Sequence, residues 1–472
     1  MSRYHTLPFG ETLKLLMQQH QLTPSALGAL LGEPASLRRA LNENLSDAKR
    51  SEIYNAILRL SIFSAPQEEM LRKALSISEL GLERHLYLRS LDDWLRITSG
   101  TLLNPSGVTA SFLDGFDSSW ELSILCVNCL FDSVMAAFRK LLQDPKRNVH
   151  IRHYFAPGSP DRSISEYLRY AQNLIFDTRY KTFTPGVNYA GSANQPVDGN
   201  LLIIKAENGT QYQELFYVVI NEQDLRPFPI PEVAGIYDYY KELLDIPLAA
   251  VPLLHHPEEP LDYSSTCLEF LSYELNRKTY IFSPDMSMGV LPPTVLEKAI
   301  NHRQPIKLSD PVAHARLLSL HARRYEYSND THKERCLISS LSGIRRFLTN
   351  GQLADHSGML RPLHPEERIT LLDTVLHYVA NNPKLSVHLL KDDTRQPAYQ
   401  IRCQHQLSVT LHKPYPAHWQ EKPYVTLCSQ AFADQMMDYL NHTIVAECCY
   451  SAQDSLRMLG ELRDDYVASL KK

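Results

Sequence analysis

The stretch Leu22–Leu60 reads LTPSALGALLGEPASLRRALNENLSDAKRSEIYNAILRL. Two short amphipathic segments, 25–31 and 35–41, are separated by Gly32-Glu33-Pro34, and a third segment, 48–60, follows a polar break. Apolar residues recur in each segment at the spacing of a one-sided helix: Leu27, Leu30 and Leu31, then Leu37 and Leu41, then Ile53, Ile57 and Leu60. Three such stripes can close a small core, so the stretch predicts a helical bundle.

The joint between the first two segments has the form that a helix-turn-helix requires. A tight turn with glycine lets the second helix cross the first steeply and project into a DNA groove. The stretch resembles the repressor-like helix-turn-helix family of transcription regulators, with Gly28 where that family has a small residue and Gly32 in the turn. Pro34 departs from the family pattern but is acceptable in a first helical turn.

The resemblance implies that the segment 35–41 is a recognition helix for double-stranded DNA. The implied contacts are Ser36, Arg38 and Arg39 in the major groove and Lys49 and Arg50 near phosphate. Arg38 and Arg39 are adjacent and point about 100° apart on a helix, which lets one approach a base edge while the other reaches phosphate. The alternative is a plain helical bundle used for packing or dimerisation.

The charge of the chain sets a limit on DNA affinity. The 472 residues carry a formal net charge of −5, whereas residues 1–60 hold seven Lys/Arg and five Asp/Glu, a balance of +2. This excess has the sign that DNA binding needs, but a domain with a strong electrostatic footprint would be far more basic. Useful affinity would therefore require a homo-oligomer, most simply a dimer that presents two recognition helices.

Composition favours a cytoplasmic protein without a membrane span. No signal peptide is evident, and the most apolar stretch, 122–138, contains Asn128 and Asp132. Eight cysteines in so long a chain do not indicate a disulfide framework. Cys126 and Cys129 have the spacing of zinc and redox sites, but their neighbours are apolar and no second pair matches, so buried thiols are predicted.

The pattern along the chain predicts a multidomain α+β protein. The expected parts are a helix-turn-helix bundle at 1–62, a helical connector at 63–115, a first α/β module at 116–260, an irregular helical middle region at 261–345 and a second α/β module at 346–472. The clearest hairpin joins 200–206 to 214–220 through Asn208-Gly209, because this pair supplies the positive φ angles of a tight turn.

A short internal match suggests that the two α/β modules are related. DPKRNVHI at 144–151 aligns without a gap with NPKLSVHL at 382–389, and both lie between a helix and a strand. The hypothesis requires Val149 and Val387 to hold equivalent positions in their sheets. Chance is the competing explanation, because helix–proline–strand joints recur in unrelated α/β proteins.

Paired modules also resemble the phospholipase D-like superfamily, in which two halves face each other across a catalytic cleft. That family has a His followed two residues later by a Lys in each half, whereas His150 is followed by Ile151-Arg152 and His388 by Leu389-Leu390-Lys391. The resemblance is therefore to a paired-module organisation that lacks the catalytic motif.

Other catalytic and metal-binding patterns are missing from the sequence. There is no dinucleotide or phosphate-cradling loop, no nucleophile elbow and no His-Glu-x-x-His helix. The candidate metal ligands His255, His256, Glu258 and Glu259, or His314 and His321, are poorly spaced to share one ion. No metal or cofactor is expected.

Two functions from different classes stay open. The first is a DNA-binding transcriptional regulator whose large C-terminal part senses an unidentified small-molecule effector or mediates assembly. The alternative is a degenerate or atypical paired-module enzyme with an accessory helical N-terminus. Basic residues at helical spacing favour the first, and the lack of an acid, a base and a nucleophile at workable spacing weakens the second.

Overall fold

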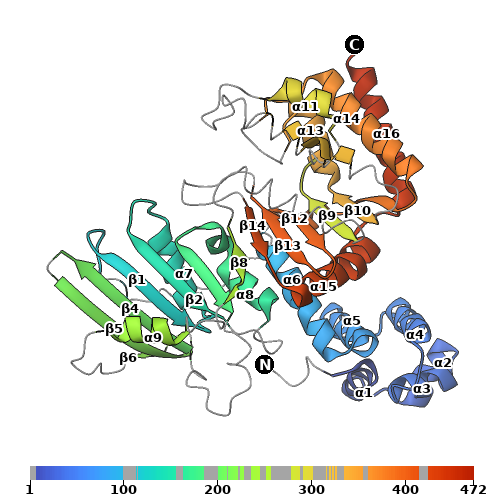
Figure 1. Ribbon diagram of the computed structural model, residues 1–472. Helices are drawn as coiled ribbons and strands as arrows, with labels where there is room; N and C mark the ends of the chain where they lie inside the picture. The colour runs from blue at the N-terminus through green and yellow to red at the C-terminus, as the bar shows by residue number, and fades with distance from the viewer. Residues whose placement is uncertain are drawn as a thin grey trace. The chain divides into compact units, whose positions relative to one another are not determined.

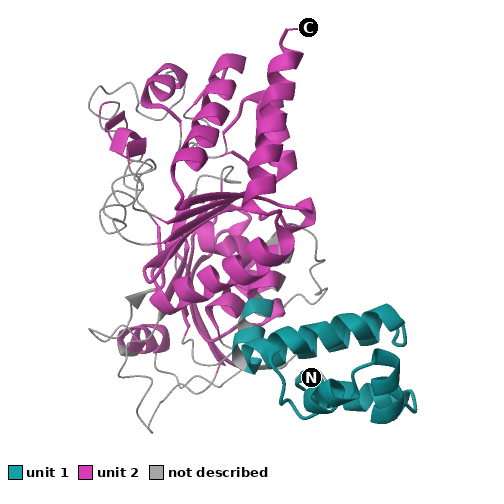
Figure 2. Ribbon diagram, turned by 90° about the vertical axis from the view of Figure 1, so that its right-hand side faces the viewer, with its two compact units in different colours: residues 1–90 teal, residues 91–472 magenta. Residues whose placement is uncertain are grey.

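The chain forms two compact units, 1–90 and 91–472, in a computed structural model (Figure 2). The described residues are 7–98, 113, 115–155, 163–184, 200–209, 211–221, 224–227, 235–244, 251–256, 278–286, 291–300, 315, 318–319, 321–323, 325–326, 334–353, 360–413 and 424–471. The first unit is helical and the second combines helices with two mixed sheets, which confirms the predicted multidomain α+β class.

The first unit is a bundle whose core joins all its helices (Figure 1). These are α1 (Phe9–Gln19), α2 (Pro24–Leu31), α3 (Pro34–Leu41), α4 (Asp47–Leu60) and α5 (Ala65–Leu80). The predicted stripes enter this core except for Leu30, which is 57% exposed. The bundle also extends past the predicted boundary at 62, because Leu71 and Leu75 of α5 are buried in the same core.

Helix α6 (Leu82–Thr98) crosses from the first unit into the second. Within the second unit, Leu91 and Trp94 are fully buried, and the Trp94 ring lies 6.5 Å from the ring of Tyr399. Asp92 accepts a 3.0 Å hydrogen bond from the Tyr439 hydroxyl and forms an ion pair with Arg395. These contacts make the end of α6 an integral part of the second unit.

The first sheet of the second unit has the strand order β6-β5-β4-β1-β2-β3-β7. Its strands are β1 (Glu121–Val127), β2 (Val149–Tyr154), β3 (Tyr180–Thr184), β4 (Asn200–Asn208), β5 (Gln211–Asn221), β6 (Asp224–Pro227) and β7 (Val251–Pro252). The helical elements that connect or follow them are α7 (Asp132–Leu142), α8 (Ile164–Ala171), η4 (Gln172–Phe176) and α9 (Ile236–Leu244). The predicted hairpin is confirmed as β4–β5, with Gly209 at φ +57° in the turn.

The second sheet has the order β11-β10-β9-β12-β13-β14-β8. Its strands are β8 (Leu254–His255), β9 (Thr279–Ser283), β10 (Arg335–Ser339), β11 (Leu385–Leu389), β12 (Gln400–Gln404), β13 (Ser408–His412) and β14 (Tyr424–Leu427). The helical elements around it are α11 (Pro293–Ala299), α13 (Leu341–Asn350), α14 (Pro365–Asn381), η8 (Asp393–Arg395), α15 (Gln430–Tyr439), η9 (Leu440–Cys448) and α16 (Ala452–Ser469).

Serine side chains begin several helices of this unit. Each serine accepts a hydrogen bond from the backbone N–H three residues on, which satisfies a donor that the first helical turn leaves open. The four pairs are Ser163 with Glu166 (3.1 Å), Ser340 with Gly343 (2.9 Å), Ser429 with Phe432 (3.3 Å) and Ser451 with Asp454 (3.0 Å). Ser340 directly follows β10, so the same residue ends a strand and starts the helix that packs back on the sheet.

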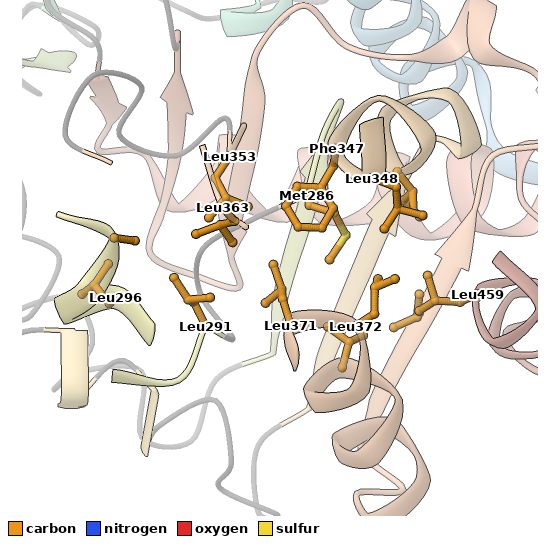
Figure 3. Packing of buried hydrophobic residues seen from close by; sticks show 14 of the residues in the cluster. Met286, Leu291, Leu296, Phe347, Leu348, Leu353, Leu363, Leu371, Leu372 and Leu459 are labelled. Carbon is orange, nitrogen blue, oxygen red and sulfur yellow. The ribbon is translucent and has the colours of Figure 1, made fainter. Parts of the chain in front are cut away.

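The core of the second module is built on β10 and β11. Leu337 and Val387 pack with Phe347 of α13, Leu371 of α14 and Leu459 of α16. Figure 3 shows the leucines of these helices, with Phe347 and Met286, converging in one layer. The three helices therefore cover the face of the sheet that β10 and β11 form.

Six of the seven strands in each sheet have the same topology, and the seventh lies at opposite ends, β7 beside β3 and β8 beside β14. In each, three strands pair in parallel in chain order, β1-β2-β3 and β9-β10-β11. The next three strands then form an antiparallel meander beside the first of them. A helix follows the meander in both cases, α9 or α15. The two sheets are thus alike in the arrangement of these six strands.

The sequence match that suggested this likeness aligns the wrong strands. Val149 lies in β2, the second parallel strand, whereas Val387 lies in β11, the third. The match instead reflects a shared local turn before each strand. Asp144 Oδ1 accepts from the N–H of Lys146 at 2.9 Å, and Asn382 Oδ1 accepts from the N–H of Lys384 at 3.0 Å.

The expected irregular middle region also needs correction. β9 and β10 lie within 261–345 and form the inner strands of the second sheet, so the second module begins well before 346. Both strands have only five residues and are largely buried. Strands this short and buried lack the alternation of polar and apolar residues by which a strand is recognised.

His153 of β2 is a buried titratable group in the first module. Its Nδ1 lies 2.7 Å from the Tyr180 hydroxyl, and the rings of Phe155, Tyr167 and Tyr180 surround it. Complete burial lowers the pKa of His153 from 6.5 to about 3, because the charged imidazolium would lose its hydration. The folded state therefore holds this histidine neutral at all ordinary pH values.

We predict that His153 makes the second unit less stable in mild acid. The unfolded chain takes up a proton near pH 6.5 and the folded chain does not, so stability is full above that pH and falls toward pH 3. The slope contributed is about 1.4 kcal/mol per pH unit. Urea unfolding between pH 7 and 5 should show this slope reduced in His153→Gln and unchanged in His377→Gln, an exposed control. Equal slopes in His153→Gln and wild type would contradict the assignment.

Candidate nucleic-acid interface

The turn between α2 and α3 consists of Gly32 and Glu33 alone. Gly32 adopts a left-handed conformation with φ +69°, which glycine accommodates without strain. The N–H of Glu33 donates to Gly28 O at 3.2 Å and closes the end of α2. Pro34 is the first residue of α3, where its missing N–H removes no helical hydrogen bond.

The two helices are in close contact at Gly28. A Cβ atom at Gly28 would lie 2.9 Å from Pro34 Cα and 3.0 Å from Pro34 Cβ. Any larger residue would thus push the start of α3 away from α2. Gly28 therefore permits the close α2–α3 contact, and Gly32 makes the turn between the two helices.

We predict that Gly28→Val destabilises the first unit by about 1–3 kcal/mol, because the added methyl groups overpack the α2–α3 contact. Ala29→Val is the matched control, since Ala29 is the next residue of α2 and is exposed. Thermal unfolding of the full chain, followed by circular dichroism, compares the two. Equal stability of the two variants would show that α2 and α3 do not depend on this contact.

Helix α3 has one buried and one exposed face. Leu37, Ala40 and Leu41 are in the core, whereas Ala35, Arg38, Arg39 and Asn42 are exposed. Neither Arg38 nor Arg39 forms an ion pair with another described residue. Both arginines were predicted to be exposed, whereas Ala35 and Asn42, which lie on the same side of the helix as Arg39, were not singled out from the sequence.

Glu33, Ser36 and Lys49 form a polar group at the start of α3. Lys49 Nζ lies 3.0 Å from Glu33 Oε2 and 2.6 Å from Glu52 Oε2. Hydrogen bonds with Glu52 and then Glu33 raise the pKa of Lys49, while bonds with Lys49 and Ser36 lower the pKa of Glu33. Ser36 and Lys49 are half-buried. Lys49 thus balances the carboxylates beside it and offers less positive charge to a phosphate than the sequence suggested.

Arg50 does not have the phosphate-facing position that the sequence analysis expected. It is only 4% exposed. Its guanidinium donates to Asp47 Oδ1 at 2.7 Å and to Leu45 O at 3.0 Å, and lies 3.5 Å from Glu43. Arg50 therefore fixes the connection between α3 and α4. Its charge suggested an exposed position, but charge alone does not show whether a residue of an amphipathic helix is buried.

His150 and His388, the two histidines compared with the phospholipase D-like motif, lie in different sheets of the second unit. His150 is exposed on β2 of the first sheet, and His388 lies on β11 of the second with its Nδ1 3.3 Å from Tyr450 O. Burial lowers the pKa of His388. The two strands hold different places in their sheets, so these residues are not equivalent members of a pair.

The described cysteine and histidine candidates are buried or close to backbone carbonyl oxygens. Cys126 and Cys129 are buried thiols, as predicted, and Cys129 Sγ donates to Leu201 O at 3.0 Å. Burial raises the pKa of Cys129 to about 12 and that of Cys126 well above its usual value. His256 Nε2 lies 2.5 Å from Ile175 O, and His321 Nε2 lies 2.7 Å from Leu291 O. Glu258, Glu259 and His314 are outside the described residues.

No group of three His, Cys, Asp or Glu side chains within the described residues is arranged to hold a metal ion. None of the described helices combines the length and apolar composition needed to cross a bilayer.

Comparison with known proteins identifies no family for this chain. No family model matches it. No curated protein matches it either. Among solved structures, phosphatidylserine synthase from Haemophilus influenzae Rd KW20 is similar at 10% identity with a TM-score of 0.26, over 82% of this chain and 91% of that one. A likeness this slight supports no inference about fold or function.

Proposed function

We propose that the protein is a transcriptional regulator that binds double-stranded DNA through α3. The observation that carries the proposal is the exposed face of α3, where Arg38 and Arg39 form no ion pair with a described residue. The glycine-dependent contact at Gly28 and the turn at Gly32 fix the helix that presents them. This combination is what a recognition helix requires.

Helical geometry assigns different roles to the two arginines. The buried side of α3 is centred near Leu37, between Ala40 and Leu41. At about 100° per residue, Arg39 points away from that side together with Ala35 and Asn42. Arg38 points to one flank. Arg39 is therefore the proposed base contact and Arg38 the proposed phosphate contact.

The low charge of the first unit requires more than one copy for useful affinity. A single unit should bind non-specific DNA with a Kd of ~10⁻⁴ M or weaker at physiological salt. Two copies, with one α3 in each half-site, would give the affinity that a regulator needs. The second unit is the proposed site of assembly or of effector sensing.

The alternative is a degenerate paired-module enzyme. The like topology of the two sheets favours it. Residue chemistry does not, because His150 and His388 lie in non-equivalent strands and both lack the lysine at the required spacing. The regulator proposal rests instead on Arg38 and Arg39, which are both exposed on α3.

We predict unequal effects of removing the two arginines. Arg39→Ala should cost roughly 1–3 kcal/mol on the selected sequence and relax selectivity. Arg38→Ala should weaken binding to all sequences alike and lower the salt slope by about one unit. The measurement is a salt titration of full-length protein on genomic fragments that surround its own gene.

The matched control is Arg59→Ala. Arg59 is an exposed arginine near the end of α4, ten residues from Lys49 and therefore about 15 Å farther along that helix. Its removal should leave both selectivity and salt slope unchanged. If the wild type selects no fragment, or if Arg38→Ala and Arg39→Ala both leave selection intact, α3 is a packing helix and the proposal is wrong.

A further inference from the structure

The chain has two Asn-Gly pairs, and all four residues are described. Asn208-Gly209 lies at the turn between β4 and β5, and Asn350-Gly351 lies at the end of α13. In such a pair the backbone nitrogen of glycine can attack the side-chain amide carbon of asparagine, because glycine has no Cβ to obstruct a close approach. The surroundings of each pair therefore decide how readily this reaction proceeds.

The first pair lies at the open tip of a hairpin. Asn208 is opposite Gln211 in the last pair of the β4–β5 ladder, and Gly209 follows in the turn with φ +57°. Gly209 is exposed and Asn208 is half-buried. A Cβ built on Gly209 would have no atom within 4 Å apart from those of its chain neighbours. The turn is therefore open to solvent.

The atoms that would react at this turn are lightly held. Among the described residues, none accepts a hydrogen bond from the N–H of Gly209. The amide of Asn208 donates from Nδ2 to Ser119 Oγ at 2.9 Å. Ser119 is exposed, so water competes for both partners and this bond restrains the amide only weakly.

The second pair is an internal control with the same two residues in a closed environment. The N–H of Gly351 donates to Phe347 O at 2.7 Å and closes the end of α13. Asn350 Oδ1 accepts from the N–H of Gln352 at 2.9 Å. Gly351 is buried, and a Cβ there would lie 2.4 Å from Leu363 O. Reaction at this pair would therefore require the helix end to open.

We propose that Asn208 is a site of spontaneous deamidation in the folded protein and that Asn350 is protected. The nitrogen of Gly209 loses its proton and forms a bond to Asn208 Cγ, the bond from Cγ to Nδ2 breaks, and ammonia leaves with that proton. Water then opens the succinimide ring at either carbonyl and gives aspartate or isoaspartate.

The products would change the hairpin in two ways. Either product adds a carboxylate next to Glu207. Isoaspartate also lengthens the main chain, so the turn could not keep the register of β4 and β5. This inference does not depend on DNA binding.

The test is incubation of the full-length protein at mildly alkaline pH, because base removes the proton from the glycine nitrogen. Peptide mapping by mass spectrometry locates the products, and enzymatic methylation of isoaspartate measures their amount. Product should form at residue 208 about tenfold faster or more than at residue 350, since reaction at 350 requires local opening of α13. In urea, where both pairs are unfolded, the two rates should become alike.

Two serine variants show whether the folded turn governs the rate. Ser119→Ala removes the hydrogen bond that restrains the amide and should speed the reaction at 208, whereas Ser118→Ala, at the exposed neighbouring position, should not. The proposal is overturned if folded protein reacts no faster at 208 than at 350, or if Ser119→Ala and Ser118→Ala react at the same rate.

Discussion

The contact between Gly28 and Pro34 is the constraint on which the first unit depends. Because a Cβ at Gly28 would lie 2.9 Å from Pro34 Cα, only glycine lets α2 and α3 meet this closely. The two-residue turn then fixes the direction of α3, and Leu37 and Leu41 anchor its inner side in the core. Arg50 holds the next connection through Asp47 and Leu45. The exposure of Arg38 and Arg39 follows from this packing.

A different constraint shapes the second unit. Each module has three parallel strands and an antiparallel meander beside the first of them, so β4 and β12 are both inner strands of their sheets. An inner strand with helices on both sides is buried on both faces, and β4 meets this condition with Leu202 and Ile204. β12 meets it with Arg402 and its polar neighbours instead. Because β4 and β12 hold corresponding places and β4 is apolar, the fold does not require polar residues at β12.

Local sequence signals predicted several helices and a hairpin of this architecture. The pairing of strands that lie far apart in the sequence could not be predicted in this way. Periodic leucines and isoleucines predicted α2, α3 and α4 of the bundle, and Asn208-Gly209 predicted the β4–β5 hairpin. β9 and β10 were missed because five buried residues carry no alternation, and Val149 was matched to Val387 because a local turn repeats where strand position does not. In the candidate interface, Arg38 and Arg39 could be identified from helical spacing. The buried state of Arg50 could not, because the charge of a residue does not show which side of α4 packs inward.

Site-specific photo-crosslinking tests the central claim, that α3 contacts DNA, most directly. A benzoylphenylalanine placed at Ala35, on the exposed face of α3, is compared with one at Asn55, an exposed position of α4, in the full-length protein. Labelled duplex DNA is offered at low salt, where phosphate contacts are strongest. Crosslinks should form from position 35 and not from position 55. Equal crosslinking from both positions, or crosslinking from 55 alone, would contradict the assignment of α3 as the recognition helix, and so would a lack of crosslinks from both.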